Sequence, residues 1–304
     1  MEIEKFIENY REAFGEAAGL PVVFWYSDEE TGHTEKIGGC FFKGMQEVRA
    51  GNTISLNAEV IGCGGGKFYT GFAPMPEHVP GFVSLKEKYK KTPGMVKEFV
   101  DELGIPRAEK KYLHFARIDR VEHFDGLEGI LFLATPDILS GLTTWAYFDN
   151  NSPDTVMAMF GSGCCSVVTQ AVLENRMGGK RTFLGFFDPS VRPWFEADIL
   201  SFTIPMSRFR VMYDTMRESC LFGTPARSNR NHVLLQEEPV WHLLFSEIHR
   251  LRATGPIASK IFYPYRSVYH AKTVGNIESP RQKFYRNFWT CPSRQSQAIS
   301  PMQP

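Results

Sequence analysis

A short unit of glycine, cysteine, helix and strand occurs twice in the sequence and constrains the fold more than any other feature. In the first copy, Gly39-Cys40 precedes an apolar helical pattern that leads to a predicted strand, Glu59-Val60-Ile61-Gly62. In the second copy, Gly163-Cys164 precedes a similar pattern that leads to Thr182-Phe183-Leu184-Gly185. The spans from first to last glycine are 23 and 22 residues. Two copies of one supersecondary unit usually pack face to face, with their equivalent loops at a common cleft.

The rest of the sequence alternates predicted strands with predicted helices of roughly 10 to 15 residues, which is typical of mixed α/β (α+β) proteins with helices packed on a sheet. Val22-Val23-Phe24-Trp25-Tyr26 is one predicted strand, residues 143–148 are another, and residues 95–103 form a predicted helix. We expect residues 1–248 to form a single globular domain built of two similar halves, at about 20–125 and 126–235.

Composition and the N-terminal pattern indicate a cytoplasmic protein. Apolar residues make up 43% of the chain, enough for a sizeable core. Residues 1–19 have helical spacing with a charged face, unlike the apolar centre of a signal peptide. The most apolar stretch, residues 130–148, is interrupted by Pro136 and Asp137, so we expect no membrane partner. In a reducing compartment the six cysteines are expected to be free, ligating or catalytic.

The C-terminal tail, residues 249–304, differs in composition from the rest. From Arg250 onward it contains nine basic residues and one acidic residue, Glu278, although the whole chain has zero net charge. Interleaved basic and aromatic residues are compatible with single-stranded nucleic acid. No nucleic-acid-binding signature accompanies them, so we favour a weakly ordered extension whose aromatic residues dock on the acidic body.

The loop Gly161-Ser162-Gly163-Cys164-Cys165-Ser166 is the strongest candidate site because it leads directly into an amphipathic helix. The N–H groups and dipole at a helix start stabilise anions, which predicts either a Cys164 thiolate of lowered pKa or a bound phosphate or carboxylate. A tight turn of small residues, with Cys164 and Cys165 as buried apolar groups, is the structural alternative.

Cys63-Gly64-Gly65-Gly66 is the second candidate, predicted at the end of a strand, where sheets of α/β proteins bind ligands. The alternative is a hairpin or bulge that needs positive φ. The run matches neither a phosphate-binding P-loop nor a dinucleotide-binding fingerprint.

The remaining candidate site residues could form a site only if the fold brings them close together. Cys40, Cys63, Cys164 and Cys165 would form a thiolate metal site if the halves face each other, although no Cys-x-x-Cys pair supports one. Arg192 is a candidate for clamping an anionic ligand near the second loop.

Several short motifs resemble the uncharacterised prokaryotic family known as domain of unknown function 169. They are Ile61-Gly62-Cys63-Gly64-Gly65 continuing to Tyr69-Thr70-Gly71-Phe72, Gly163-Cys164 at a helix start, Phe202-Thr203-Ile204-Pro205 before a helix, and Glu237-Glu238-Pro239-Val240-Trp241. The likeness covers residues 5–245 and excludes the basic tail. It implies a cytoplasmic mixed α/β protein with glycine and cysteine positions at a cleft, and no established activity.

These observations lead to three functional hypotheses. The first is binding of a small anionic ligand or cofactor, of unknown identity, in a cleft lined by Cys63, Gly64, Gly65, Gly161, Ser162, Gly163, Cys164, Cys165 and Arg192. The second is thiol-dependent group transfer with Cys164 as nucleophile. The third, which we favour least, is nucleic-acid binding through the tail.

Overall fold

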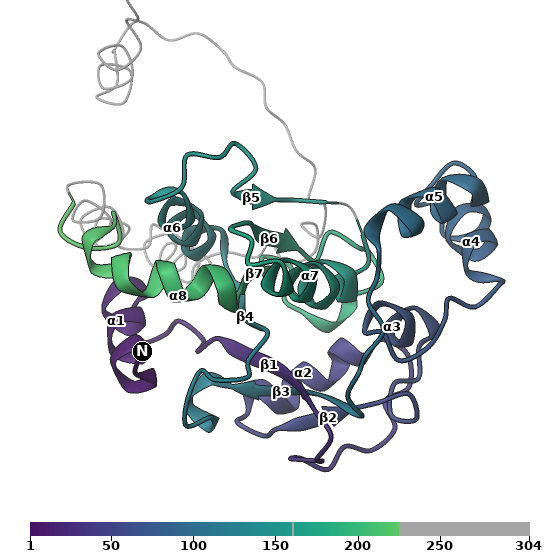
Figure 1. Cartoon of the computed structure of the whole chain (residues 1–304), viewed down its shortest axis with the longest axis horizontal. Helices are drawn as coiled ribbons and strands as arrows, with labels where there is room; N and C mark the ends of the chain where they lie inside the picture. Colours follow the sequence, from purple (N-terminus) through teal and green to yellow (C-terminus); the bar gives the residue numbers. More distant parts are fainter. Residues whose placement is uncertain (160, 225–304) are drawn as a thin grey trace, which may run out of the picture. The chain divides into compact units, whose positions relative to one another are not determined.

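A seven-stranded sheet organises the residues that the structure, a computed structural model, describes: 1–159 and 161–224 (Figure 1). The strand order is β2-β3-β1-β4-β7-β6-β5, and every neighbouring pair is antiparallel except β5 and β6. The strands are β1 (Val22–Ser27), β2 (Ile54–Leu56), β3 (Tyr112–Arg117), β4 (Gly129–Ala134), β5 (Val156–Met157), β6 (Thr182–Gly185) and β7 (Leu200–Pro205). The predicted mixed α+β fold class is confirmed.

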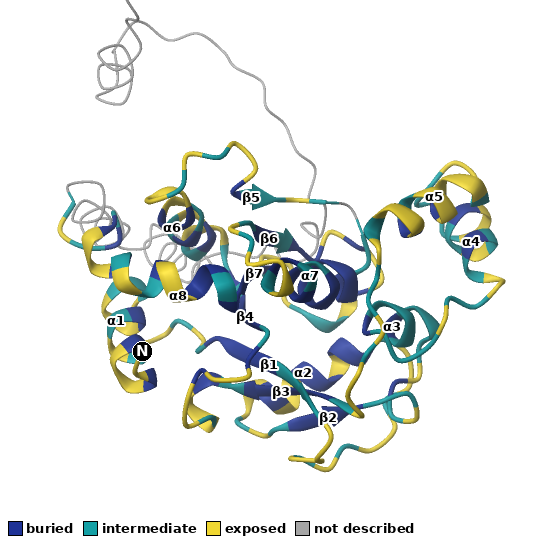
Figure 2. Cartoon of the chain, viewed as in Figure 1, coloured by how far each residue is buried: buried dark blue, intermediate teal, exposed yellow. Residues whose placement is uncertain are grey.

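Helices cover both faces of this sheet. On one face lie α1 (Ile3–Phe14), α6 (Pro136–Tyr147) and α8 (Met206–Thr215), which share one hydrophobic cluster. On the other face lie two composite helices that share a second cluster. They are η1 (Phe41–Gly44) continuing into α2 (Met45–Arg49), and the π-helical η4 (Cys165–Thr169) continuing into α7 (Gln170–Arg176). Figure 2 shows the central strands as buried.

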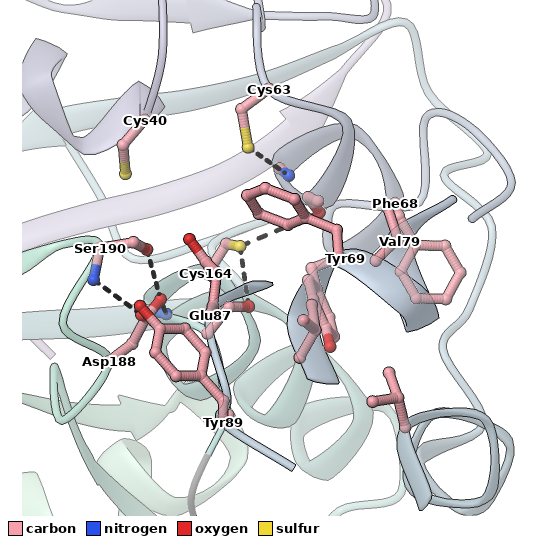
Figure 3. Close-up of a pocket in the computed structure, with 18 of the residues that line it drawn as sticks. Cys40, Cys63, Phe68, Tyr69, Val79, Glu87, Tyr89, Cys164, Asp188 and Ser190 are labelled. Carbon is pink, nitrogen blue, oxygen red and sulfur yellow. Dashed lines mark hydrogen bonds between the residues drawn. The ribbon is translucent and has the colours of Figure 1, made fainter. Parts of the chain in front are cut away.

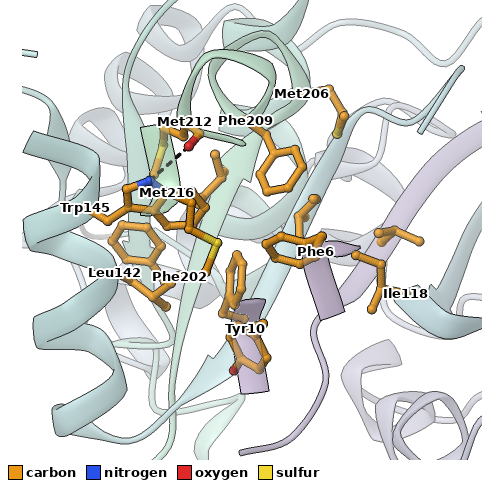
Figure 4. Packing of buried hydrophobic residues seen from close by; sticks show 14 of the residues in the cluster. Phe6, Tyr10, Ile118, Leu142, Trp145, Phe202, Met206, Phe209, Met212 and Met216 are labelled. Carbon is orange, nitrogen blue, oxygen red and sulfur yellow. Dashed lines mark hydrogen bonds between the residues drawn. The ribbon is translucent and has the colours of Figure 1, made fainter. Parts of the chain in front are cut away.

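Strand alternation divides the side chains between these two clusters. Val23 and Ile130 face α1, α6 and α8, whereas Val22, Phe24 and Leu131 face the composite helices. Figure 4 shows the first cluster, in which Phe6 and Tyr10 of α1 pack near Phe209 of α8 and Trp145 of α6. The Trp145 indole donates to the Met212 carbonyl at 3.0 Å, so its buried polar group is satisfied.

The same pairing pattern occurs on both sides of the β1–β4 pair. β3 pairs with all six residues of β1, and β7 pairs with all six residues of β4. β2 then pairs with residues 113–115 of β3, and β6 with residues 201–203 of β7. In each case these are the second to fourth residues of the inner strand. β1 and β4 themselves pair through their first three residues, centred on Val23 and Ile130.

Two predicted strands are wrong. Residues 59–62 form a turn in which the Asn57 side chain accepts hydrogen bonds from the backbone N–H groups of Glu59 and Val60, both at 2.9 Å. Only a single bridge between Ile37 and Ile61 remains there, and β2 occupies residues 54–56 instead. Residues 143–148 belong mostly to α6, whose buried positions Leu139, Leu142, Trp145 and Ala146 have helical spacing.

A helical segment between β2 and β3 completes the part of the fold that matters for the site. It contains α3 (Gly64–Tyr69), α4 (Val79–Gly81), the π-helical η2 (Phe82–Lys86) and α5 (Pro93–Leu103). The predicted helix at 95–103 is confirmed as α5, which begins after Thr92, whose hydroxyl accepts from the Met95 N–H at 3.2 Å, and ends at Gly104 with φ 59°. In Figure 1, α4 and α5 lie together on one side of the sheet.

Short 3-10 segments complete the assignment: η3 (Ile118–Arg120), η5 (Arg192–Trp194) and η6 (Met216–Glu218). In the described part of the chain, no helix combines the length and apolar character needed to cross a bilayer. The predicted tail at 249–304 lies outside the described residues.

Candidate functional site

The second glycine-cysteine loop forms a helix start, as predicted. The Ser162 carbonyl accepts from the N–H groups of Cys165 at 2.9 Å and Ser166 at 3.1 Å, so Ser162 caps the helix that continues through η4 and α7. The Gly163 N–H donates to the Asp188 carboxylate at 3.3 Å. This backbone donor at the helix start is therefore occupied by an acidic side chain of the protein itself.

The Cys63 loop differs from its prediction. Cys63 does not end a strand; it caps α3, and its sulfur accepts from the Gly66 N–H at 3.0 Å. Gly64, Gly65 and Gly66 form the first turn of this helix without positive φ. A Cβ atom on Gly66 would lie 3.0 Å from Ile61 and 3.1 Å from Phe41, so glycine here allows α3 to approach its neighbours closely.

Both loops line one cavity of about 480 Å³. Cys40 reaches it from the loop before η1, Cys63 from the start of α3, and Cys164 from the start of the η4 helix. Figure 3 shows these three cysteines around the same space. Most of the wall is apolar or aromatic and comes from α3, the connection from α3 to α4, α4, η2, α5 and η5: Phe68, Tyr69, Met75, Pro76, Val79, Phe82, Val83, Val96, Phe99, Val100 and Trp194.

Most of the predicted site residues lie at this cavity, but not all of them. Those that line it are Cys40, Cys63, Gly65, Gly161, Ser162, Gly163 and Cys164. Gly64 does not line it; a Cβ atom there would meet Pro76 at 3.0 Å. Cys165 faces a separate and much smaller cavity. Arg192 does not line the cavity, and its guanidinium donates to the carbonyls of Glu196, Ala197 and Ile199, so it fastens its own loop.

The predicted lowering of the Cys164 pKa is also wrong. Burial raises the pKa of the Cys164 thiol well above its ordinary value, although a hydrogen bond between this thiol and the Ser162 hydroxyl opposes this effect. Burial likewise raises the pKa of Cys165 to about 12 and that of Cys40 to about 11. The loss of hydration therefore affects the thiol pKa more than the N–H groups at the helix start do, and these thiols stay protonated at neutral pH.

Metal binding receives no geometric support. Among the residues that the structure describes, no three His, Cys, Asp or Glu side chains form a group that could hold a metal ion. The four-cysteine site suggested by the sequence is also divided, because Cys165 faces away from the other three.

Acidic residues at the cavity are the main feature that sequence reasoning missed. Asp188 is only 4% exposed, and its carboxylate accepts from the Ser190 N–H at 2.9 Å and the Ser190 hydroxyl at 2.8 Å. Glu87 is half-buried nearby, and its pKa is raised by burial and by the charge of Asp188, while a hydrogen bond from Tyr89 lowers it. Lys90 also lines the cavity, with its ammonium 4.7 Å from the centre of the Phe99 ring.

Two residues close in sequence to these acidic residues have a strained backbone, which the sequence does not reveal. Lys88 and Phe186 are the two non-glycine residues with positive φ in the described chain, at 59° and 68°. Lys88 separates Glu87 from Tyr89, and Phe186 lies two residues before Asp188. Such conformations concentrate at functional sites.

Comparison with known proteins identifies the family but no activity. The family model for domain of unknown function 169, described as "Uncharacterised ArCR", matches residues 19–215, more than half of the chain. No curated protein and no solved structure matches the chain. The chain belongs to the family domain of unknown function 169.

Proposed function

We propose that this protein binds a small, largely apolar molecule in the cavity bounded by Cys40, Cys63 and Cys164. The observation that carries the proposal is the cavity itself: its volume of about 480 Å³ and its mostly aromatic and aliphatic wall match the usual properties of small-molecule sites. A few polar groups at one side, including Asp188 and Ser190, would fix the orientation of a ligand.

The position of the cavity is consistent with a duplicated fold, which we also propose. Cys40 and Cys63 lie between β1 and β3, whereas Cys164 and Asp188 lie between β4 and β7. These two segments occupy equivalent places in the matching strand patterns. Loops at equivalent places in two related halves commonly enclose a shared site.

The lining argues against the anionic ligand expected from the sequence. Arg192 is engaged elsewhere, the Gly163 N–H is taken by Asp188, and two carboxylates face the site, whereas the ammonium of Lys90 lies over the Phe99 ring. The raised pKa of Cys164 also disfavours thiol-dependent transfer, because such a reaction needs the thiolate.

Titration with N-phenyl-1-naphthylamine, a neutral dye that fluoresces in apolar surroundings, tests the proposal. We expect saturable binding to the wild-type protein and at least a tenfold weaker affinity for Val79→Trp, because Val79 lines the cavity and a larger ring would occupy its space. The matched control is Val211→Trp on α8, where Val211 is exposed and does not line the cavity. Equal affinities for the two variants would contradict the proposal.

A further inference from the structure

We propose that the ligand of this cavity carries an ammonium group, which the carboxylates of Glu87 and Asp188 receive while its apolar part fills the aromatic wall. The inference rests on the proposed function, because it assigns a chemical class to the ligand of the same cavity.

Among the described residues, Asp188 is a buried carboxylate without a basic partner. Its oxygens accept hydrogen bonds from Gly163 and Ser190, and these donors are neutral. Within residues 1–159 and 161–224, neither Asp188 nor Glu87 forms an ion pair with a lysine, arginine or histidine side chain. A buried negative charge without a counter-charge is costly, so a cationic ligand would bind where the protein has left that charge uncompensated.

Glu87 lies close enough to Asp188 for their charges to interact. The negative charge of Asp188 contributes to the raised pKa of Glu87 and also to that of Tyr89. The ionised form of Glu87, which the neighbouring negative charge disfavours, would be stabilised by a cation placed beside the two carboxylates. Figure 3 shows Glu87, Tyr89, Asp188 and Ser190 on one side of the pocket, with Phe68 and Val79 on the other.

The wall suits the remainder of such a ligand. Tyr89 and Trp194 line the same cavity as the carboxylates, and aromatic faces attract organic cations. Residues such as Phe68, Val79 and Val96 offer only apolar surface for the rest of the molecule. The cavity therefore combines an acidic side with an apolar side, which favours an amphiphilic amine over either a bare cation or a fatty acid.

Displacement of bound N-phenyl-1-naphthylamine by three ten-carbon compounds tests the inference. Decylammonium, decanol and decanoate share one alkyl chain and differ in the charge of the head group. All three compounds are used below their critical micelle concentrations. We expect decylammonium to bind about tenfold more tightly than decanol, because hydrogen bonds between charged groups are stronger than those between neutral groups. We expect decanoate to bind more weakly than decanol, because two carboxylates would repel it.

Substitutions then assign the preference to the named residues. Glu87→Gln should reduce decylammonium affinity nearly to that of decanol and leave decanol affinity unchanged. Asp188→Asn should act in the same direction in a sample whose melting curve shows a folded protein. Glu98→Gln is the matched control, since Glu98 is exposed on α5 and does not line the cavity. It should change neither affinity.

The outcomes separate the two proposals. If the dye and decanol bind but decylammonium binds no better than decanol, or if Glu87→Gln leaves its preference intact, the ammonium assignment is wrong and the cavity proposal stands. If neither the dye nor decanol binds, both proposals are wrong.

Discussion

Single residues show how burial, rather than sequence neighbours, sets the chemistry of this chain. His114 on β3 is fully buried, stacks on Trp25 with ring centres 4.9 Å apart, and is surrounded by hydroxyl groups. Its Nε2 lies 2.8 Å from the Ser27 hydroxyl, and its Nδ1 lies 2.9 Å from the hydroxyls of Thr31 and Ser55. Burial lowers the pKa of His114 to about 4, whereas a hydrogen bond to the Glu29 backbone and the charge of Glu30 act in the opposite direction.

The lowered pKa of His114 predicts a loss of stability in mild acid. The unfolded chain binds a proton at this histidine below pH 6.5, whereas the folded protein binds it only near pH 4. The free energy of unfolding therefore falls as the pH is lowered from 6.5 to about 4, and it levels off at lower pH. When the pH is lowered from 7 to 5, we expect His114 to lower the free energy of unfolding by about 2 kcal/mol.

Urea denaturation at the two pH values measures this effect. His114→Gln should remove this part of the pH dependence, whereas the control His123→Gln, at an exposed position, should retain it. An unchanged pH dependence in His114→Gln would show that His114 does not resist protonation in the folded protein.

Among the elements, η4 packs closely on the sheet at one glycine of β6. Gly185 ends β6, and a Cβ atom there would lie 2.2 Å from the Ser166 hydroxyl of η4 and 2.8 Å from the Ser201 hydroxyl of β7. Glycine at this position lets the cavity-bearing helix pack directly on the strands. The position of Cys164 at the cavity depends on this packing.

Gly185→Ala should therefore destabilise the protein by about 1 to 3 kcal/mol, as overpacking of a dense interior usually does. Gly19→Ala is the control, because a Cβ atom there meets nothing within 4 Å and the backbone has no positive φ. Urea denaturation of both variants measures the difference. Equal stability of the two variants would mean that η4 shifts freely on the sheet.

Predictions of elements from the sequence succeeded where a local pattern was unambiguous. The α5 helix was predictable because Gly104 ends an amphipathic pattern. Residues 143–148 misled because their threonines and aromatic residues are typical of strands, whereas the start at Pro136 and the spacing of Leu139, Leu142 and Trp145 favour the helix that forms.

At the scale of the whole molecule, the fold brings together what the sequence keeps apart. The glycine and cysteine loops around Cys63 and Cys164 were recognisable as candidates because small residues next to a helix start are a local signal. Glu87 and Asp188 were not recognised as cavity residues, because only the tertiary packing of the segment that follows η2 and of the loop after β6 brings them there. The acidic character of the site was therefore invisible to the sequence.

We propose that one cavity, bounded by loops from both sides of the β1–β4 pair, holds an apolar small molecule. The most direct measurement is a crystal structure of the protein with a bromine-substituted N-phenyl-1-naphthylamine, in which anomalous scattering locates the bromine atom. We expect an anomalous peak inside the cavity, between the Cys63 and Cys164 loops and the wall formed by α4 and α5. A peak at another surface, or an empty cavity at saturating ligand, would contradict it.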